Sequence, residues 1–149
     1  MMYITDNSRI LSREELSTPE EITNEIPLDK ESSKLIFGAR RSISQILHRQ
    51  DDRLIVVVGP CSIHDPKAAL EYAKLLKDFS SSVENELMLV MRVYFEKPRT
   101  TIGWKGLIND PRLDNSFKIN EGLRISRKLL KDIADLGMPT GTEFLDLIS

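Results

Sequence analysis

Residues 57–65 read VVGPCSIHD, and residues 91–101 read MRVYFEKPRTT. In each stretch an apolar run passes directly into a polar turn that contains proline. Apolar runs without alternation are typical of strands that are buried on both faces of a parallel sheet. Proteins built on parallel sheets place their chemistry at the carboxyl ends of the strands. The two stretches therefore predict parallel strands whose ends meet at a functional site.

Helix signals alternate with these strands along the chain. Thr18, Pro19 and Glu21 predict the capped start of a short first helix. Asp65-Pro66 predicts the start of another helix further along the chain. Asn120 is expected to cap the last helix. We expect further helices at about 29–48, 65–79 and 120–136, strands at 54–58, 87–93 and 142–145, and a long ordered loop over 94–119.

The order β-α-β-α-β predicts a parallel α/β fold with right-handed crossovers. This order does not separate an open doubly wound sheet from a closed (β/α)8 barrel. The first strand is not followed by a Gly-x-Gly-x-x-Gly sequence, and the chain has no Walker A sequence. Nucleotide-binding sheets are therefore disfavoured.

Composition narrows the class of protein further. The chain has 149 residues and a formal net charge of −2, which gives no reason to expect nucleic acid or an anionic membrane as a partner. The single cysteine excludes an internal disulfide framework and fits a reducing compartment. Residues 1–13 lack the apolar run of a signal peptide, and no stretch approaches the ~20 apolar residues of a membrane span. We expect a soluble, cytoplasmic protein.

Cys61 follows the first strand, after Gly59-Pro60. A lone cysteine is most often a buried structural residue, and the alternatives are a metal ligand and a nucleophile. His64 stands three residues further on and invites a two-ligand interpretation, although a loop residue is the simpler one. A thiol and an imidazole at one strand end, beside three cations at the next, favour a metal next to an anion site.

The cations of the second stretch are Arg92, Lys97 and Arg99. Arg92 lies within an apolar strand, so its charge must meet a partner or water. Its role is either a salt bridge or a bidentate clamp on a carboxylate or phosphate. Lys97, Arg99 and Thr100 are suited to phosphate oxygens, with Pro98 stiffening the turn. A solvated basic loop is the alternative.

Two further residues are weaker candidates. Lys105 lies between Trp104 and Gly106 and is expected near the site. Glu143 is placed at the end of the third strand, where an acid is either catalytic or substrate-orienting. A structural carboxylate that pairs the neighbouring cations remains an equal alternative.

These residues also carry a family resemblance. The stretches 59–65 (GPCSIHD), 92–101 (RVYFEKPRTT) and 103–111 (GWKGLINDP) resemble the signatures of type I 3-deoxy-D-arabino-heptulosonate 7-phosphate (DAHP) synthases. The likeness is close to verbatim from about Asp51 to Leu145 and looser before that. The family enzyme is considerably longer, so the chain resembles its N-terminal part.

The resemblance implies a (β/α)8 barrel preceded by an extension. Residues 1–50 would form a helical N-terminal extension with oligomer and regulatory roles, and 51–149 the first part of the barrel with its first three strands. Three strands of a barrel leave an apolar edge unpaired. We therefore expect the fragment to be marginally stable or prone to aggregation alone.

The resemblance also implies a role for each site residue. Cys61 would be a ligand of a divalent metal of the Mn, Fe, Co or Zn type, whose remaining ligands lie beyond residue 149. Arg92 and Lys97 would contact phosphoenolpyruvate and carry catalysis. Lys97, Arg99 and Thr100 would approach erythrose 4-phosphate, with Arg99 and Thr100 on its phosphate. Asp6 and Asn7 stand where a contact to a feedback inhibitor is expected.

The function implied is the condensation of phosphoenolpyruvate with D-erythrose 4-phosphate to DAHP and phosphate, the first step of aromatic amino-acid biosynthesis. The expected partners are these two substrates, an aromatic amino-acid inhibitor and further copies of the chain in a dimer or tetramer. One alternative is an inactive truncated fragment that acts at most as an oligomer-binding or ligand-binding piece. A related aldolase-type barrel is a second, disfavoured by the length of the match.

Overall fold

The computed structural model describes residues 6–7, 9–10, 12–99 and 102–145. Its strands form one parallel sheet in the order β1-β2-β3. The predicted parallel α/β class is confirmed. The elements are α1 (Pro19–Glu25), α2 (Lys30–Leu47), β1 (Leu54–Val58), α3 (Pro66–Ser80), β2 (Leu87–Arg92), α4 (Ile119–Asp135) and β3 (Thr140–Gly141).

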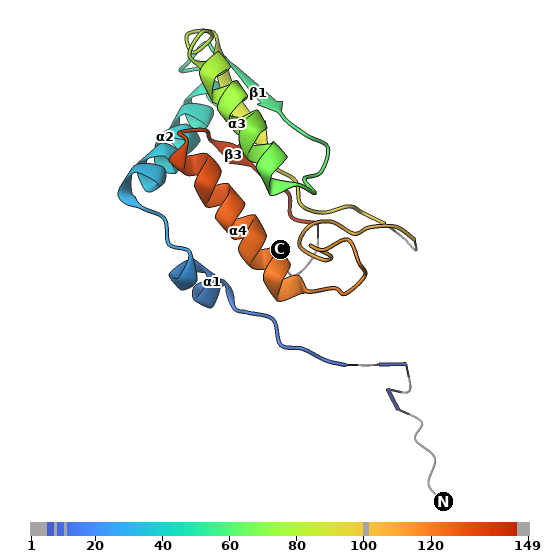
Figure 1. Cartoon of the computed structure of the whole chain (residues 1–149). Coiled ribbons are helices and arrows are strands. Elements are labelled where there is room, and N and C mark those ends of the chain that lie inside the picture. Colours follow the sequence, from blue (N-terminus) through green and yellow to red (C-terminus); the bar gives the residue numbers. More distant parts are fainter. Residues whose placement is uncertain (1–5, 8, 11, 100–101, 146–149) are drawn as a thin grey trace, which may run out of the picture.

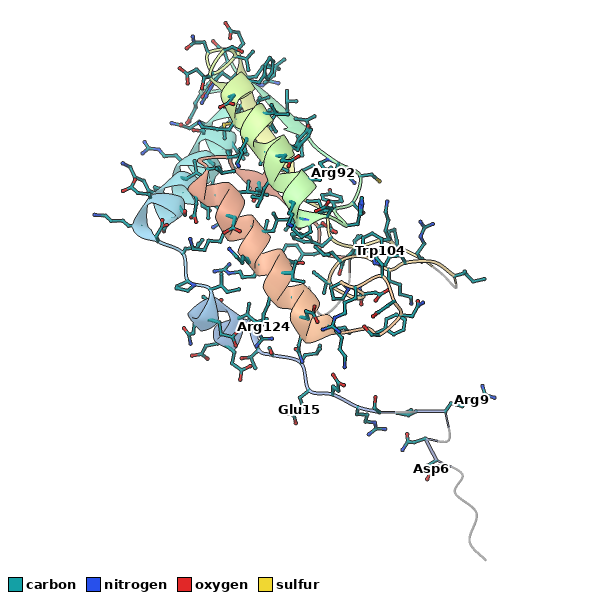
Figure 2. All side chains as sticks on the ribbon, in the orientation of Figure 1. Asp6, Arg9, Glu15, Arg92, Trp104 and Arg124 are labelled. Atoms are coloured by element: carbon teal, nitrogen blue, oxygen red, sulfur yellow. The ribbon has the colours of Figure 1, made fainter. Side chains whose placement is uncertain are left out.

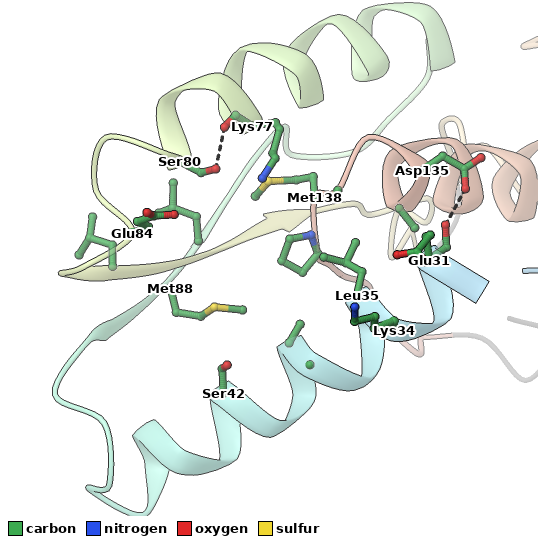
Figure 3. A pocket seen from close by; sticks show the side chains of 18 of the residues that line it. Glu31, Lys34, Leu35, Ser42, Lys77, Ser80, Glu84, Met88, Asp135 and Met138 are labelled. Carbon is green, nitrogen blue, oxygen red and sulfur yellow. Dashed lines mark hydrogen bonds between the residues drawn. The ribbon is translucent and has the colours of Figure 1, made fainter. Parts of the chain in front are cut away.

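Helices α3 and α4 lie side by side on one face of the sheet (Figure 1). The core lies where they meet it: Ala73 of α3, Met91 of β2 and Ile133 of α4 have no exposed surface. Helix α2 contacts α4 and β1. A cavity of about 590 Å³ remains between α2 and the start of β2, and Figure 3 shows Ser42 and Met88 facing each other across it.

Local capping signals explain where two helices start. The Thr18 hydroxyl accepts the Glu21 amide while the Glu21 carboxylate accepts the Thr18 amide, which is the predicted capping box. The Asp65 carboxylate accepts the amides of Lys67 and Ala68 at the start of α3. These two predicted helix starts are confirmed.

The predicted cap of α4 is wrong. Helix α4 begins at Ile119, and its N-cap residue, Lys118, makes no side-chain capping bond. The Asn120 amide group bonds instead to the N-terminal segment: its Oδ1 accepts the Ser17 amide at 2.7 Å, and its Nδ2 donates to the Glu15 carbonyl. These partners lie more than 100 positions from Asn120, so the residues around Asn120 in sequence gave no indication of the contact.

The predicted burial of the strands holds for β2 but not for β1. Leu89, Val90 and Met91 of β2 are buried, whereas Leu54 and Val57 of β1 are 67% and 56% exposed. In the described part of the chain β1 pairs with β2 alone, in register from Leu54–Leu87 to Val58–Met91. One edge of β1 and part of its surface therefore face solvent.

The third strand is shorter and earlier than the predicted 142–145. It consists of Thr140 and Gly141, which pair with Met91 and Arg92. Beyond this point the amides of Phe95 and Glu96 bond to the Glu143 side chain rather than to a neighbouring backbone. The hydrogen-bond ladder between β2 and β3 ends here because the Glu143 side chain, and not a backbone carbonyl, accepts the next amides.

Gly59 marks the closest approach of the first turn to β2. A Cβ atom at Gly59 would lie 2.4 Å from the carbonyl oxygen of Arg92, a distance at which backbone must shift. Gly38, in the middle of α2, has no atom within 4 Å of the equivalent position. The two glycines therefore form a matched pair, one sterically required and one not.

We predict that Gly59→Ala lowers the free energy of unfolding by about 1–3 kcal/mol, since overpacking forces β1 and β2 apart. Gly38→Ala should raise it by about 0.5–1 kcal/mol, because alanine is the better helix former. Urea denaturation of both variants measures the difference. Equal effects of the same sign would contradict the close approach.

Candidate functional site

The ends of β1 and β2 bring the cysteine turn and the Arg92 side chain together. The Arg92 guanidinium donates to the Pro60 carbonyl at 3.0 Å and lies 3.9 Å above the centre of the Tyr94 ring. The hydrogen bond and the cation–π contact both fix its plane. Arg92 has no carboxylate partner within salt-bridge distance among the described residues, so the salt-bridge interpretation is not supported.

Cys61 is exposed rather than buried, so the structural interpretation of this residue is not supported. The Lys97 ammonium donates to its sulfur at 2.9 Å. Hydrogen bonding from Lys97, followed by that from Arg92, lowers the pKa of the Cys61 thiol. Cys61 and Lys97 are 36 positions apart in sequence but in contact in the fold. The thiol thus has two cations, Lys97 and Arg92, beside it.

The Lys97 loop, defined here as residues 95–107, is held as a short antiparallel hairpin in its described part. The Lys97 amide donates to the Lys105 carbonyl at 3.0 Å, and the Leu107 amide donates to the Phe95 carbonyl. Gly106 has φ +116°, and a Cβ atom there would lie 2.1 Å from the Phe95 oxygen. The hairpin therefore places Lys105 beside Lys97 on the backbone.

The base of this loop is closed by Trp104 and Asp110. The Trp104 indole donates to the Asp110 carbonyl at 2.8 Å. The Asp110 carboxylate is buried and accepts the Asn115 amide at 3.2 Å. The long connection after β2 is thus ordered as predicted in its described part.

Glu143 lies at the end of β3 but does not face the cations. Its Oε1 atom accepts the amides of Phe95 and Glu96 at 2.8 and 2.7 Å. Its Oε2 atom accepts the Thr142 hydroxyl. The structure therefore brings Glu143 to the backbone of the Lys97 loop and not to the ammonium or guanidinium groups.

In the described part of the chain, none of the remaining predicted residues bonds to the Cys61 thiol or to the Arg92 guanidinium. Pro98 and Arg99 are exposed, and Thr100 lies outside the described residues. Asp6 and Asn7 are exposed on the N-terminal segment, where Asn7 accepts a bond from Arg13. Figure 2 shows Asp6 far from Arg92. His64 is exposed and takes no part in the cluster.

Two further residues at this site, Glu96 and Ser62, were not predicted from the sequence. Glu96 is 4% exposed, and its carbonyl accepts the Ser62 hydroxyl at 2.9 Å. A signal for Glu96 did exist, since it is an acid directly after the apolar run 93–95 that follows β2, where a charge needs a partner. Ser62 offered no comparable signal.

Within the described part of the chain, no three His, Cys, Asp or Glu side chains lie close enough to hold a metal ion. Cys61 is an exposed thiol whose pKa is lowered, which suits one thiolate ligand of a soft metal. The described residues thus fit one ligand of a metal centre and not a whole one.

Comparison with known proteins gives the family. The model of the DAHP synthetase I family matches residues 22–149. The chain belongs to this family. It is 56% identical over 144 residues to a phospho-2-dehydro-3-deoxyheptonate aldolase of Amycolatopsis methanolica, covering 97% of this chain and 71% of the relative. Over 149 residues it is 54% identical to the Phe-sensitive aldolase of Escherichia coli K12, covering 100% of this chain and 43% of the relative.

A solved structure agrees with the sequence match. The aldolase of the same name from Francisella tularensis SCHU S4 superposes with a TM-score of 0.89 at 53% identity, over 93% of this chain and 41% of that one. The chain therefore spans about two fifths of the Escherichia and Francisella proteins. No helix in the described residues is both long and apolar enough to cross a membrane.

We predict that Cys61 is alkylated by iodoacetamide at lower pH than an isolated cysteine, because only the thiolate reacts. Lys97→Met should move the midpoint of the rate–pH profile upward, since the larger cause of the lowered pKa is removed. Lys105→Met is the control, because Lys105 makes no bond to the sulfur. The label is quantified on the peptide that carries Cys61. An unchanged midpoint in Lys97→Met would disprove the contact.

Proposed function

We propose that this chain acts in a 3-deoxy-7-phosphoheptulonate synthase, which condenses phosphoenolpyruvate with D-erythrose 4-phosphate to DAHP and phosphate. The observation that carries the proposal is the convergence of Arg92 and Lys97 with Cys61 at the ends of β1 and β2. Membership of the DAHP synthetase I family supports the reaction class. Two anionic substrates require several fixed cations, and this end of the sheet supplies them.

The same proposal extends to the architecture. The three parallel strands with α3 and α4 would be the first part of a (β/α)8 barrel that begins near residue 51, with residues 1–50 as its helical extension. The exposed apolar surface of Leu54 and Val57 supports further strands beside β1. Chemistry at the carboxyl ends of the strands is the rule for such barrels.

In this reaction C3 of phosphoenolpyruvate forms a bond to the aldehyde carbon of erythrose 4-phosphate. Water adds at C2, and inorganic phosphate leaves. Arg92, whose plane is fixed by Pro60 and Tyr94, would hold phosphoenolpyruvate through its paired N–H groups. Lys97 would contribute a second cation and offset charge that develops in the transition state.

The second substrate would bind further along the Lys97 loop. Arg99 and Thr100 are proposed at its phosphate, with Lys97 and Lys105 nearby and Pro98 limiting the motion of the turn. A divalent metal held in part by Cys61 would, when bound, polarise the aldehyde or activate water. Its other ligands would come from outside the described residues.

Regulation and assembly complete the proposal. The Escherichia relative is named Phe-sensitive and a Schizosaccharomyces pombe relative tyrosine-inhibited. An aromatic amino acid is therefore the proposed inhibitor here, with Asp6 and Asn7 among its contacts. The proposed assembly is a dimer or tetramer of this chain. Asp6 lies far from Arg92 in the single chain, so the proposed inhibitor would act from a separate site (Figure 2).

The test is turnover by the protein purified from its own cells, with both substrates and Mn²⁺. We expect Lys97→Met to lower kcat/KM by roughly 100-fold or more, as loss of one charge-stabilising donor does. Lys128→Met is the matched control, since Lys128 is an exposed lysine of α4 paired with Asp132. Absence of turnover in the unaltered protein, or equal rates for both variants, would refute the proposal.

A further inference from the structure

Two carboxylates connect the end of β2 with the end of β3 in opposite directions. Glu143 reaches from the β3 side and accepts the amides of Phe95 and Glu96. Glu96 reaches from the β2 side, and its Oε2 atom accepts the Leu145 amide at 3.2 Å. Each segment thus binds the backbone of the other through an acid. We call this pair of contacts the carboxylate clasp.

The clasp fixes the backbone directly before Lys97. Three successive amides, those of residues 95–97, have defined acceptors: Glu143 for the first two and the Lys105 carbonyl for the third. The carbonyl of Glu96 accepts the Ser62 hydroxyl from the turn that carries Cys61. The peptide units that lead into Lys97 are therefore held from β3, from the hairpin and from the cysteine turn.

Stability alone does not account for Glu96. Its side chain is 4% exposed, and its buried Oε1 atom has no hydrogen-bond partner among the residues that the structure describes. A buried polar atom left unpaired costs folding free energy that an apolar side chain of similar size would not incur. In return, the other oxygen of Glu96, Oε2, accepts a directional hydrogen bond from the Leu145 amide beyond β3.

We propose that Glu96 and Glu143 are positioning residues, which hold Lys97 in place for the phosphorylated substrate through the backbone rather than through their charge. This inference rests on the proposed function of Lys97. It also gives Glu143 a role different from an acid catalyst or an ion-pair partner, because its described contacts are to the amides of Phe95 and Glu96 and to the Thr142 hydroxyl rather than to a cation.

Two substitutions at Glu143 separate the effect of side-chain length from the effect of charge. Glu143→Gln keeps the length of the side chain and a carbonyl oxygen that can accept both amides, but it removes the charge. Glu143→Asp keeps the charge, but it is one methylene shorter and cannot span to both amides. A positioning role predicts that the Gln variant is nearly normal and the Asp variant impaired, whereas acid catalysis or charge pairing predicts the reverse order.

The experiment combines amide exchange with kinetics. In Glu143→Asp and Glu143→Ala, hydrogen exchange at the Phe95 and Glu96 amides should accelerate. In these variants and in Glu96→Ala, KM for phosphoenolpyruvate should rise roughly tenfold or more, with a smaller change in kcat, because a displaced binding group weakens substrate positioning. Glu143→Gln and Glu96→Gln should stay within about threefold of the unaltered protein in KM, a difference well under 1 kcal/mol.

Asp29→Ala is the matched control. Asp29 also accepts a backbone amide, that of Ser32 at the start of α2, so its loss should reduce Tm without moving KM. KM values for Glu143→Asp and Glu96→Ala that match those of Asp29→Ala would overturn the proposal, as would a Gln variant more impaired than the Asp variant. Exchange needs no substrate, so failure of the clasp is distinguishable from failure of the unaltered protein to bind phosphoenolpyruvate.

Discussion

The parallel pairing of β1 with β2 is the constraint on which the site depends. Their register runs without interruption from Leu54–Leu87 to Val58–Met91, so both strands end at the same level. Gly59 then passes so close to Arg92 that a side chain would collide with the backbone. A shift by one residue would reverse the face on which Arg92 lies and separate it from Pro60.

This pairing sets only the starting point of the two loops. The positions of the cations depend on further contacts, each made by a different kind of group. A cation–π contact fixes the Arg92 plane, a hairpin fixes the backbone of Lys97 and Lys105, and Glu143 fixes the peptide units before Lys97. A functional loop on a rigid sheet is a common arrangement, and here the loop itself is tightly hydrogen-bonded.

What the sequence predicted correctly was local. Capping by Thr18 and Asp65 depends on residues three positions away or fewer, and the apolar runs of β1 and β2 are continuous in sequence. The rule that parallel strands end at one edge of a sheet predicted that the cysteine turn and the cations lie near each other, but it did not predict the Lys97–Cys61 contact itself. The approximate positions of the helices and the approach of the cysteine turn to the cationic side chains were therefore predictable.

Interactions between distant segments were not predictable in this way. Asn120 was taken for a helix cap because its preference for caps is local, while its real partners lie in the N-terminal segment. The third strand was placed at 142–145 because nothing in the sequence shows that the Glu143 side chain would bind the amides of Phe95 and Glu96. Glu96 itself was overlooked beside three more conspicuous cations.

The central claim is that Arg92 and Lys97, brought together by the β1–β2 register, form one anion-binding site. A crystal structure of the protein with phosphoenolpyruvate tests it most directly. We predict density for the ligand at the ends of β1 and β2, with its carboxylate or phosphate oxygens within about 3.2 Å of both side chains. Density at another place, with Arg92 still bound only to Pro60 and Lys97 still on Cys61, would contradict the account.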